Sequence, residues 1–317
     1  MRLIPRKATA ALAAGLAGIA LLYLSASALV AKPSTPPTGP TETRVSVVPL
    51  SFDPDDATKT KFGQLTYRGG LNLFARSVHF GGYSAIALDP SGTTLLALSD
   101  AGSWMRATLG YDGTRLDSMS NVRLGPILGR DGKPLQSETE QDAEGIALLS
   151  GDTYTGSALV SFERDHRILQ YPFTPERFGP PTGTMPLPKA ARGMSANQGL
   201  EAIATIRSGR MKGTVVAFSE RLQDRAGNLI GWLIGGPAPG TITIRRLGGF
   251  DITGAAGLPD GGLLLLERRF RYSEGVKMRI RRIAPADLRR GKLITGETLL
   301  EADDLLNIDN MEAIALH

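Results

Sequence analysis

The stretch that decides the fold covers residues 142–165 and reads DAEGIALLSGDTYTGSALVSFERD. Its first apolar run leads into a turn that contains glycine, and a second apolar run then ends in an acidic residue. Short apolar runs separated by such a turn are typical of two paired β-strands. The stretch therefore predicts a β-hairpin.

Four other segments repeat this pattern. They are GYSAIALDPSGTTLLALSD (82–100), GLEAIATIRSGRMKGTVVAFSER (199–221), DITGAAGLPDGGLLLLERR (251–269) and NMEAIALH (310–317). Alignment of the first apolar run gives one column that contains Ser84, Glu144, Glu201, Thr253 and Glu312, at spacings of 60, 57, 52 and 59 residues. A regular period of about 57 residues indicates a repeat architecture.

Further short apolar segments lie between the hairpins, at residues 105–111, 168–173, 229–234, 241–247 and 277–283. Together with the hairpins they give about four strands per period, which is typical of a propeller blade. The region of residues 45–76 supplies additional strands. We therefore predict an all-β fold, a β-propeller of five or six blades with six favoured. A β-sandwich array is the competing fold, but it does not explain the long regular period.

The composition of the 317-residue chain indicates a folded protein and excludes several kinds of site. Hydrophobic residues make up 42% of the chain and charged residues 21%, which is enough apolar material for a core. The 38 glycines and 20 prolines indicate many turns. The absence of cysteine excludes disulfides, thiolate metal sites and a cysteine nucleophile, and three histidines argue against a His-rich metal centre.

The amino end is typical of a targeting segment. Basic residues at positions 2, 6 and 7 precede an apolar run over residues 8–24, and Ser-Ala-Ser-Ala at 25–28 fits a cleavage site. We predict that residues 1–31 are a signal peptide and that the protein is periplasmic or secreted. The alternative is an uncleaved membrane anchor formed by residues 8–31, which are long enough to span a bilayer.

Residues 32–42, KPSTPPTGPTE, are predicted to be a linker, so the folded domain covers residues 43–317. Without residues 1–31, which carry three basic groups and no acids, the formal charge falls from +5 to +2. The chain has no long basic stripe with interleaved aromatic residues, so nucleic acid is not an expected partner. We expect a monomer that reaches the membrane only through an uncleaved N-terminal segment.

The aligned column has a chemical meaning if the fold is a propeller. The innermost strand of each blade lines a central channel, so Ser84, Glu144, Glu201, Thr253 and Glu312 would converge there. Three carboxylates packed together repel one another unless a cation joins them. Oxygen ligands suit a hard ion, Ca²⁺ or Mg²⁺. The alternative is that these side chains bond the backbone of neighbouring blades and hold the ring closed.

A second column stands at the end of the second strand and contains Asp100, Glu163, Glu220 and Glu267. Three of these acids are followed directly by Arg164, Arg221 and Arg268. Arginine binds phosphate through two parallel hydrogen bonds, so acids and guanidinium groups at one rim could hold a metal-bound phosphate. The alternative is a set of ion pairs between blades, which stabilise little where they are exposed.

Several of these segments carry a family resemblance. They include LALSDAG (96–102), LGYDGTRL (109–116), SFERDHRI (161–168), GLEAIA (199–204) and NMEAIA (310–315). From about residue 63 to its end, the chain resembles the phytase-like family of bacterial extracytoplasmic proteins, described as having esterase-like activity of phytase. The resemblance implies a propeller, hydrolysis of phosphoesters or related esters, and calcium. It also implies Glu144, Glu163, Glu201, Glu220 and Glu312 as site residues.

The chain departs from the family pattern at two places. Ala101 stands where relatives have arginine, which removes one phosphate contact. The chain also ends at His317, directly after NMEAIALH, where relatives continue into another strand. We expect either a shortened gene product or a last blade closed by a strand such as residues 45–50, since a missing strand leaves an exposed edge.

These patterns together favour an extracytoplasmic, metal-assisted hydrolase of small-molecule phosphoesters or related esters. The predicted metal ligands are Ser84, Glu144, Glu163, Glu201, Thr253 and Glu312. Arg164, Arg221 and Arg268 are predicted to stabilise charge on phosphoryl oxygens, and Glu220 or Asp100 to act as general base. The alternatives are a non-catalytic, calcium-stabilised propeller that binds a ligand or envelope partner, and a lactonase-type hydrolase.

Overall fold

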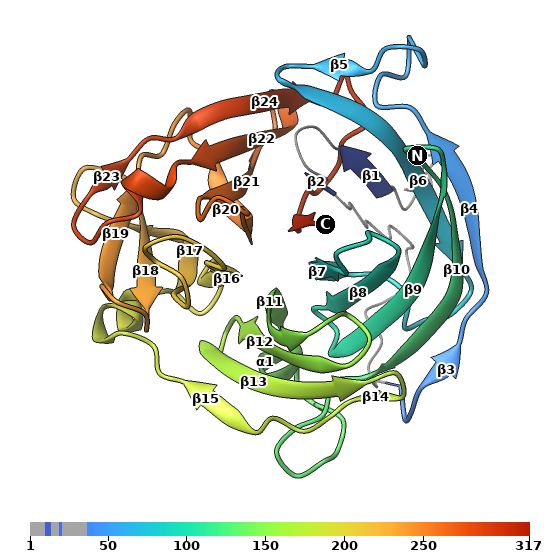
Figure 1. Ribbon diagram of the computed structural model, residues 1–317, viewed down its shortest axis with the longest axis horizontal. Coiled ribbons are helices and arrows are strands. Elements are labelled where there is room, and N and C mark those ends of the chain that lie inside the picture. Colours follow the sequence, from blue (N-terminus) through green and yellow to red (C-terminus); the bar gives the residue numbers. More distant parts are fainter. Residues whose placement is uncertain (1–9, 14–18, 21–36) are drawn as a thin grey trace.

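The computed structural model describes residues 10–13, 19–20 and 37–317, and its sheets stand around a central axis (Figure 1). In this described part, strands account for most of the regular structure, with one short α-helix, α1 (Glu138–Gln141). The innermost strands of the sheets contact one another in a closed ring. The propeller prediction is thereby confirmed, with five blades and not the six that the sequence favoured.

Four blades are each built mainly from one sequence repeat. The first contains β7 (Tyr83–Leu88), β8 (Thr94–Ser99), β9 (Ser103–Asp112), β10 (Arg115–Pro126) and the added strand β3 (Thr41–Glu42). The second contains β11 (Ala143–Gly151), β12 (Gly156–Phe162), β13 (Arg167–Thr174), β14 (Arg177–Phe178) and β15 (Gly183–Met185). The third contains β16 (Leu200–Thr205), β17 (Val215–Gln223), β18 (Leu229–Ile234), β19 (Gly240–Ile244) and β23 (Leu293–Ile294). The fourth contains β20 (Asp251–Gly257), β21 (Leu263–Arg271), β22 (Gly275–Ile283) and β24 (Glu297–Asp303).

The fifth blade is built from distant parts of the chain. Its innermost strand is β25 (Ala315–Leu316), which lies between β20 and β7 and pairs with β2 (Ile19–Ala20). Its outer part is β6 (Leu65–Ala75), which pairs with β1 (Ala10–Ala13), β4 (Val45–Leu50) and β5 (Lys61–Phe62). The strands of residues 45–76 therefore complete the fifth blade and do not form a sixth, which is why the favoured number was too high.

The predicted signal peptide or anchor, residues 1–31, lies outside the described residues except for residues 10–13 and 19–20. Among the described residues, no helix is long and apolar enough to cross a membrane. The predicted linker lies partly outside the described range, but β3 at its end already pairs with β10 of the first blade.

The core lies between neighbouring blades, because each sheet is covered on both faces. On β21, Leu264 and Leu266 pack against Met311 of the fifth blade, and Leu263 and Leu265 pack in the cluster shared with the third blade. All four leucines are fully buried. Burial on both faces explains why this strand reads as a continuous apolar run in the sequence.

The inner strands of the first four blades share one local irregularity. Pairing with the second strand skips a residue between Tyr83 and Ala85, Ala143 and Gly145, Leu200 and Ala202, and Ile252 and Gly254. The skipped residues are Ser84, Glu144, Glu201 and Thr253, which form the column found in the sequence. A β-bulge leaves its extra residue unpaired and redirects its side chain. The backbone therefore takes these four side chains out of the regular alternation of the strand.

Candidate metal centre

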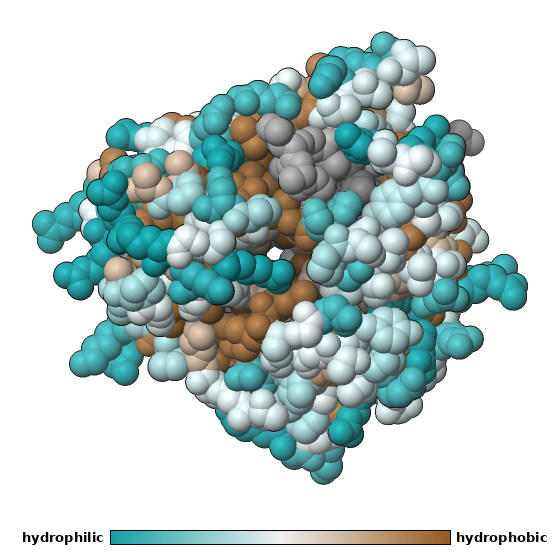
Figure 2. All heavy atoms as spheres, viewed as in Figure 1, coloured by the Kyte–Doolittle hydropathy of each residue, from teal (hydrophilic) through white to brown (hydrophobic). Residues whose placement is uncertain are grey.

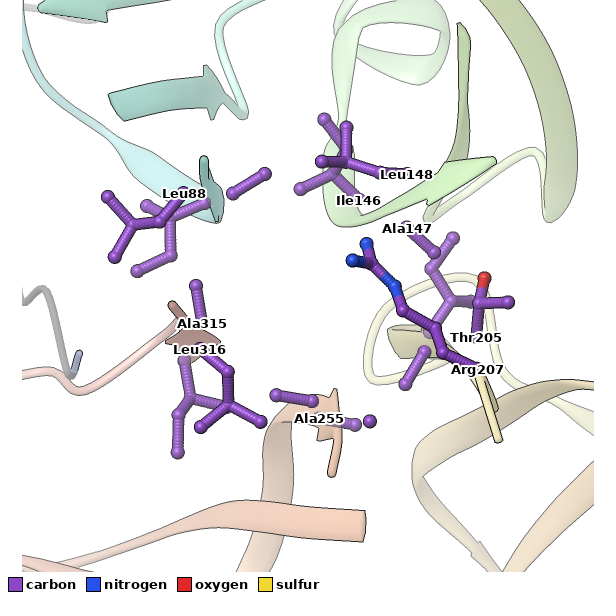
Figure 3. A pocket seen from close by; sticks show the side chains of 16 residues that line it. Leu88, Ile146, Ala147, Leu148, Thr205, Arg207, Ala255, Ala315 and Leu316 are labelled. Carbon is purple, nitrogen blue, oxygen red and sulfur yellow. The ribbon is translucent and has the colours of Figure 1, made fainter. Parts of the chain in front are cut away.

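The channel along the propeller axis has an acidic end and an apolar end. Ser84, Glu144, Thr253 and Glu312 line the space at the acidic end. Figure 3 shows the other end, where residues such as Leu88, Leu148 and Leu316 surround the axis with Arg207 beside them. In the space-filling view a narrow opening lies at the middle of the ring (Figure 2). The carboxylates of the channel are therefore gathered at one end.

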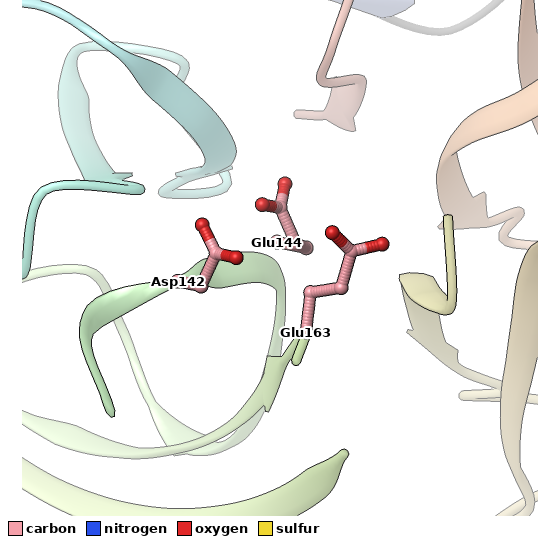
Figure 4. A group of neighbouring side chains, drawn as sticks. All are labelled: Asp142, Glu144 and Glu163. Atoms are coloured by element: carbon pink, nitrogen blue, oxygen red, sulfur yellow. The ribbon is translucent and has the colours of Figure 1, made fainter. Parts of the chain in front are cut away.

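Three carboxylates at the acidic end are close enough to hold one metal ion. Asp142, Glu144 and Glu163 each offer an oxygen, and these oxygens lie within 4.8 Å of one another. Their side chains converge on a shared space (Figure 4). Two of them, Glu144 and Glu163, are ligands that the sequence predicted, and Asp142 stands two places before Glu144.

Local structure in the second blade places this triad. Ser137 begins α1 with a capping box, in which its side chain and that of Glu140 bond each other's backbone N–H groups. Asp142 directly follows this helix, and the backbone N–H of Glu163 donates to the Asp142 carbonyl at 2.8 Å. The Glu163 carboxylate accepts the N–H of Gly199 at 2.6 Å.

Gly199 approaches the second blade so closely that a larger residue does not fit. A Cβ atom at this position would lie 1.9 Å from Cε1 of His166. The glycine therefore allows the backbone N–H of the third blade to reach the carboxylate of Glu163.

The acidic end brings several carboxylates close together. Burial raises the pKa of Glu144, and the nearby carboxylates of Glu312 and Asp142 raise it further. Burial also raises the pKa of Glu201, with Glu144 and Glu220 as the next causes. Carboxylates that repel in this way are stabilised by a bound cation. The donor set, which is all oxygen, fits a hard ion such as Ca²⁺.

Arg268 supplies an internal cation on one side of the channel. Its guanidinium pairs with Glu312, bonds Asn310, and lies 3.7 Å from Glu220. Burial alone would lower the pKa of Arg268, but Glu312 and Glu220 outweigh this effect and raise it. Arg268 therefore compensates Glu312 and Glu220.

The other two predicted arginines also lie in ion pairs. The Nε of Arg164 donates to Asp142 of its own blade at 2.6 Å, and the Nε of Arg221 donates to Asp251 of the next blade at 3.1 Å. Sequence reasoning missed Asp251. Its signal was available, because Asp251 stands two places before Thr253, as Asp142 stands two places before Glu144.

The structure separates the members of the second column. The negative charge of Asp100 contributes to the raised pKa of Glu144 and of Glu312. Glu220 is buried, and burial raises its pKa although Arg221 and Arg268 lower it. Glu267 is instead directed away from the channel, into a fully buried ion pair with Arg281.

The two hydroxyl groups of the first column have partners in the next blade. Ser84 donates to the carbonyl of Ala143, and Thr253 donates to the carbonyl of Met311 at 2.7 Å. These bonds join the first blade to the second and the fourth to the fifth. The structure thus gives Ser84 and Thr253 the contacts of the latch that the sequence offered as the alternative.

Replacement of Thr253 with valine tests the latch. The variant keeps the shape of the side chain but loses the donor to Met311, and we expect it to lower the free energy of unfolding by about 1 kcal/mol. Urea unfolding measures this value. Thr241→Val, at an exposed position on β19, is the control, and an equal effect of both substitutions would contradict the latch.

The raised pKa values predict how stability depends on pH. Glu144, Glu201 and Glu312 start from an ordinary pKa of 4.5 and are all shifted upward, mainly by burial. Above about pH 4.5 the folded state therefore binds more protons than the unfolded state, and stability falls as pH rises. In a chelator we expect the melting temperature to fall from about pH 5 to pH 8, and calcium to reduce the fall. Calorimetry measures both profiles, and a profile in chelator that is flat or rises with pH would contradict the prediction.

The chain matches a known protein family and is similar to solved structures. Residues 78–317 match the sequence model of the Phytase-like family, described as "Esterase-like activity of phytase". Among solved structures, the chain is similar to the β-propeller domain of Cps50 (Swd1) from Myceliophteria thermophila, with 11% identity, a TM-score of 0.36, and coverage of 86% of this chain and 93% of that one. It is also similar to the WD40 repeats of RRP9, with 10% identity, a TM-score of 0.34, and coverage of 83% and 86%. No protein with a curated description matches the chain.

Proposed function

Because the chain belongs to the phytase-like family, we propose that it is a calcium-dependent hydrolase of phosphoesters or related esters. The observation that carries the proposal is the triad of Asp142, Glu144 and Glu163, whose oxygens lie within 4.8 Å of one another. Asp142 of this triad pairs with Arg164. An acidic oxygen site next to a guanidinium group suits an anionic substrate held through a cation.

Calcium held by the triad would supply Lewis-acid chemistry. The residues of the chain then have separate tasks. Arg268 still has N–H donors beyond those that bond Glu312 and Asn310, since a guanidinium carries five. These donors would bind phosphoryl oxygens and stabilise the charge that develops on them. Glu220, 3.7 Å from Arg268 and with a raised pKa, would accept a proton from the attacking water. Asp100 is the second candidate for this base.

Phosphate release tests the proposal. We expect the protein to release phosphate from 4-nitrophenyl phosphate or phytate in calcium and to lose this activity in a chelator. Arg268→Met should lower kcat/KM about 100-fold, as expected for loss of a donor to the transition state. Arg282→Met, which removes a surface arginine paired with Asp260, is the control. Absence of turnover in saturating calcium would contradict the proposal.

A non-catalytic, calcium-stabilised propeller is the second candidate. The observation that favours it is that Arg164, Arg221 and Arg268 all bond acids of the chain itself, as structural ion pairs do. Calcium that raises the melting temperature without cleavage of any ester would support this function. Hydrolysis of a lactone without phosphate release would instead indicate the lactonase-type reaction.

We also propose that the substrate is a small ester and that the protein is a monomer located in the periplasm or secreted. The order of basic, apolar and small residues over residues 1–31 supports this location. Cell fractionation tests it, and recovery of the protein in membranes would favour an anchor formed by residues 8–31.

A further inference from the structure

The hairpin between β21 and β22 extends beyond the acidic end of the channel. The inner strand β20 begins at Asp251, which pairs with Arg268. Beyond that point β21 and β22 continue to pair through Arg269 and Lys277, Phe270 and Val276, and Arg271 and Gly275. The tip of this hairpin therefore projects past the inner strand, at the end where Arg268 and the carboxylates lie.

Phe270 shares a strand face with Arg268. Side chains alternate along β21, and Leu264, Leu266 and Arg268 all face the fifth blade, where Arg268 pairs with Glu312. Phe270 is the next residue on this face and lies about 7 Å further along the strand. Phe270 is thus the next side chain on this face after Arg268, whose guanidinium we assign to phosphate.

The aromatic side chains at the hairpin tip are exposed. Phe270 is 58% exposed and Tyr272 is fully exposed, and their rings meet edge to face with centroids 5.3 Å apart. Two large rings that contact each other and water are unlike apolar side chains scattered singly over a surface, which need no explanation.

Ion pairs hold this hairpin in place. Glu274 pairs with Arg269, Arg271 and Lys277 at the base of the turn. Arg269 also stacks over Phe250 and donates to the carbonyl of Gly248 at 2.7 Å. A braced hairpin presents the two rings in a defined position, which reduces the entropy lost when a ligand binds them.

The geometry points to an apolar subsite, formed by Phe270 and Tyr272, for the non-reacting aryl or alkyl group of an ester whose phosphoryl group is held at Arg268. This inference rests on the proposed function and defines its substrate class. The aromatic rings would bind the apolar group through stacking and edge contacts. A phosphoester with an apolar alcohol portion is therefore preferred over one with a polar, highly charged portion.

Binding of two non-hydrolysable analogues tests the subsite. In calcium, calorimetry should show that the wild-type protein binds phenylphosphonate about tenfold more tightly than methylphosphonate, a difference of about 1.4 kcal/mol. The double variant Phe270→Ser, Tyr272→Ser should lose this preference and bind both analogues as the wild type binds methylphosphonate. Tyr154→Ser is the matched control, because Tyr154 is also exposed but belongs to the turn between β11 and β12, at the opposite end of the blades.

Each result bears on one of the two proposals. Equal binding of the analogues by the wild type, a preference that survives in the double variant, or binding of neither analogue would overturn the subsite. Preference for phenylphosphonate without turnover of any ester would support the subsite and contradict the hydrolase. Phosphate release without this preference would support the hydrolase and contradict the subsite.

Discussion

Replacement of Arg281 with methionine should lower the free energy of unfolding by about 3 kcal/mol, the largest effect on stability that we expect for a single residue. Arg281 and its partner Glu267 are both fully buried, and the Nε of Arg281 donates to the carboxylate at 2.8 Å. The guanidinium also donates to the carbonyls of Arg245 and Thr295. Loss of the arginine leaves a buried carboxylate without its main partner. The cost lies at the low end of the range of about 3–5 kcal/mol because Arg279 remains 3.6 Å from Glu267.

Urea unfolding measures the effect, and two further variants show its cause. Arg282→Met removes the adjacent arginine, whose pair with Asp260 is about half exposed, and should change stability by less than about 1 kcal/mol. The double variant Glu267→Leu, Arg281→Met removes both buried charges and should recover most of the loss. If the double variant is as unstable as Arg281→Met, the loss of stability comes from the changed shape of the side chain at position 281 and not from the unpaired charge of Glu267.

Replacement of Glu144 with glutamine should abolish most of the stabilisation by calcium. At a calcium concentration 100 times its Kd, the wild-type protein gains about 2.7 kcal/mol, which corresponds to a rise of about 5 °C in melting temperature. The variant keeps the shape of the side chain but loses one of three charged ligands. In chelator the order should reverse, because burial and then the nearby carboxylates raise the pKa of Glu144, and glutamine removes the charge that both disfavour.

Thermal unfolding in calcium and in chelator measures both effects on the same samples. Asp117→Asn, which neutralises an exposed acid on β10, is the control and should respond to calcium as the wild type does. Equal stabilisation of Glu144→Gln and the wild type by calcium would remove the triad as a metal site.

The sequence was sufficient for most of the fold. A period of about 57 residues with four strands each predicts blades, and the strands of the first four blades, apart from β3 and β23, lie close together in the chain. The fifth blade could not be predicted in this way, because β25 and β6 are separated by more than two hundred residues and belong to no common repeat. Residues 45–76 have strand patterns of their own, which suggested an additional blade.

The sequence predicts those site residues whose positions follow from the symmetry of the propeller. Equivalent positions in a propeller face the same axis, so the first column could be assigned before its contacts were known. The partners of the second column follow from side-chain directions that symmetry does not determine. Arg164 turns back to Asp142, while Arg221 reaches the next blade. Glu267 resembles Glu163 in sequence, but Arg281 on the neighbouring strand binds it in the core.

The bulges in the four inner strands have a consequence for how such a channel can evolve. At each bulge the main chain fixes the direction of the side chain, so exchanging one residue there requires no rebuilding of the strand. Serine, glutamate and threonine already occupy equivalent bulges in the four blades. Substitutions at Ser84 or Thr253 could therefore add acidic groups around the axis one at a time, and the repeated hairpin offers a scaffold on which charge is adjusted in small steps.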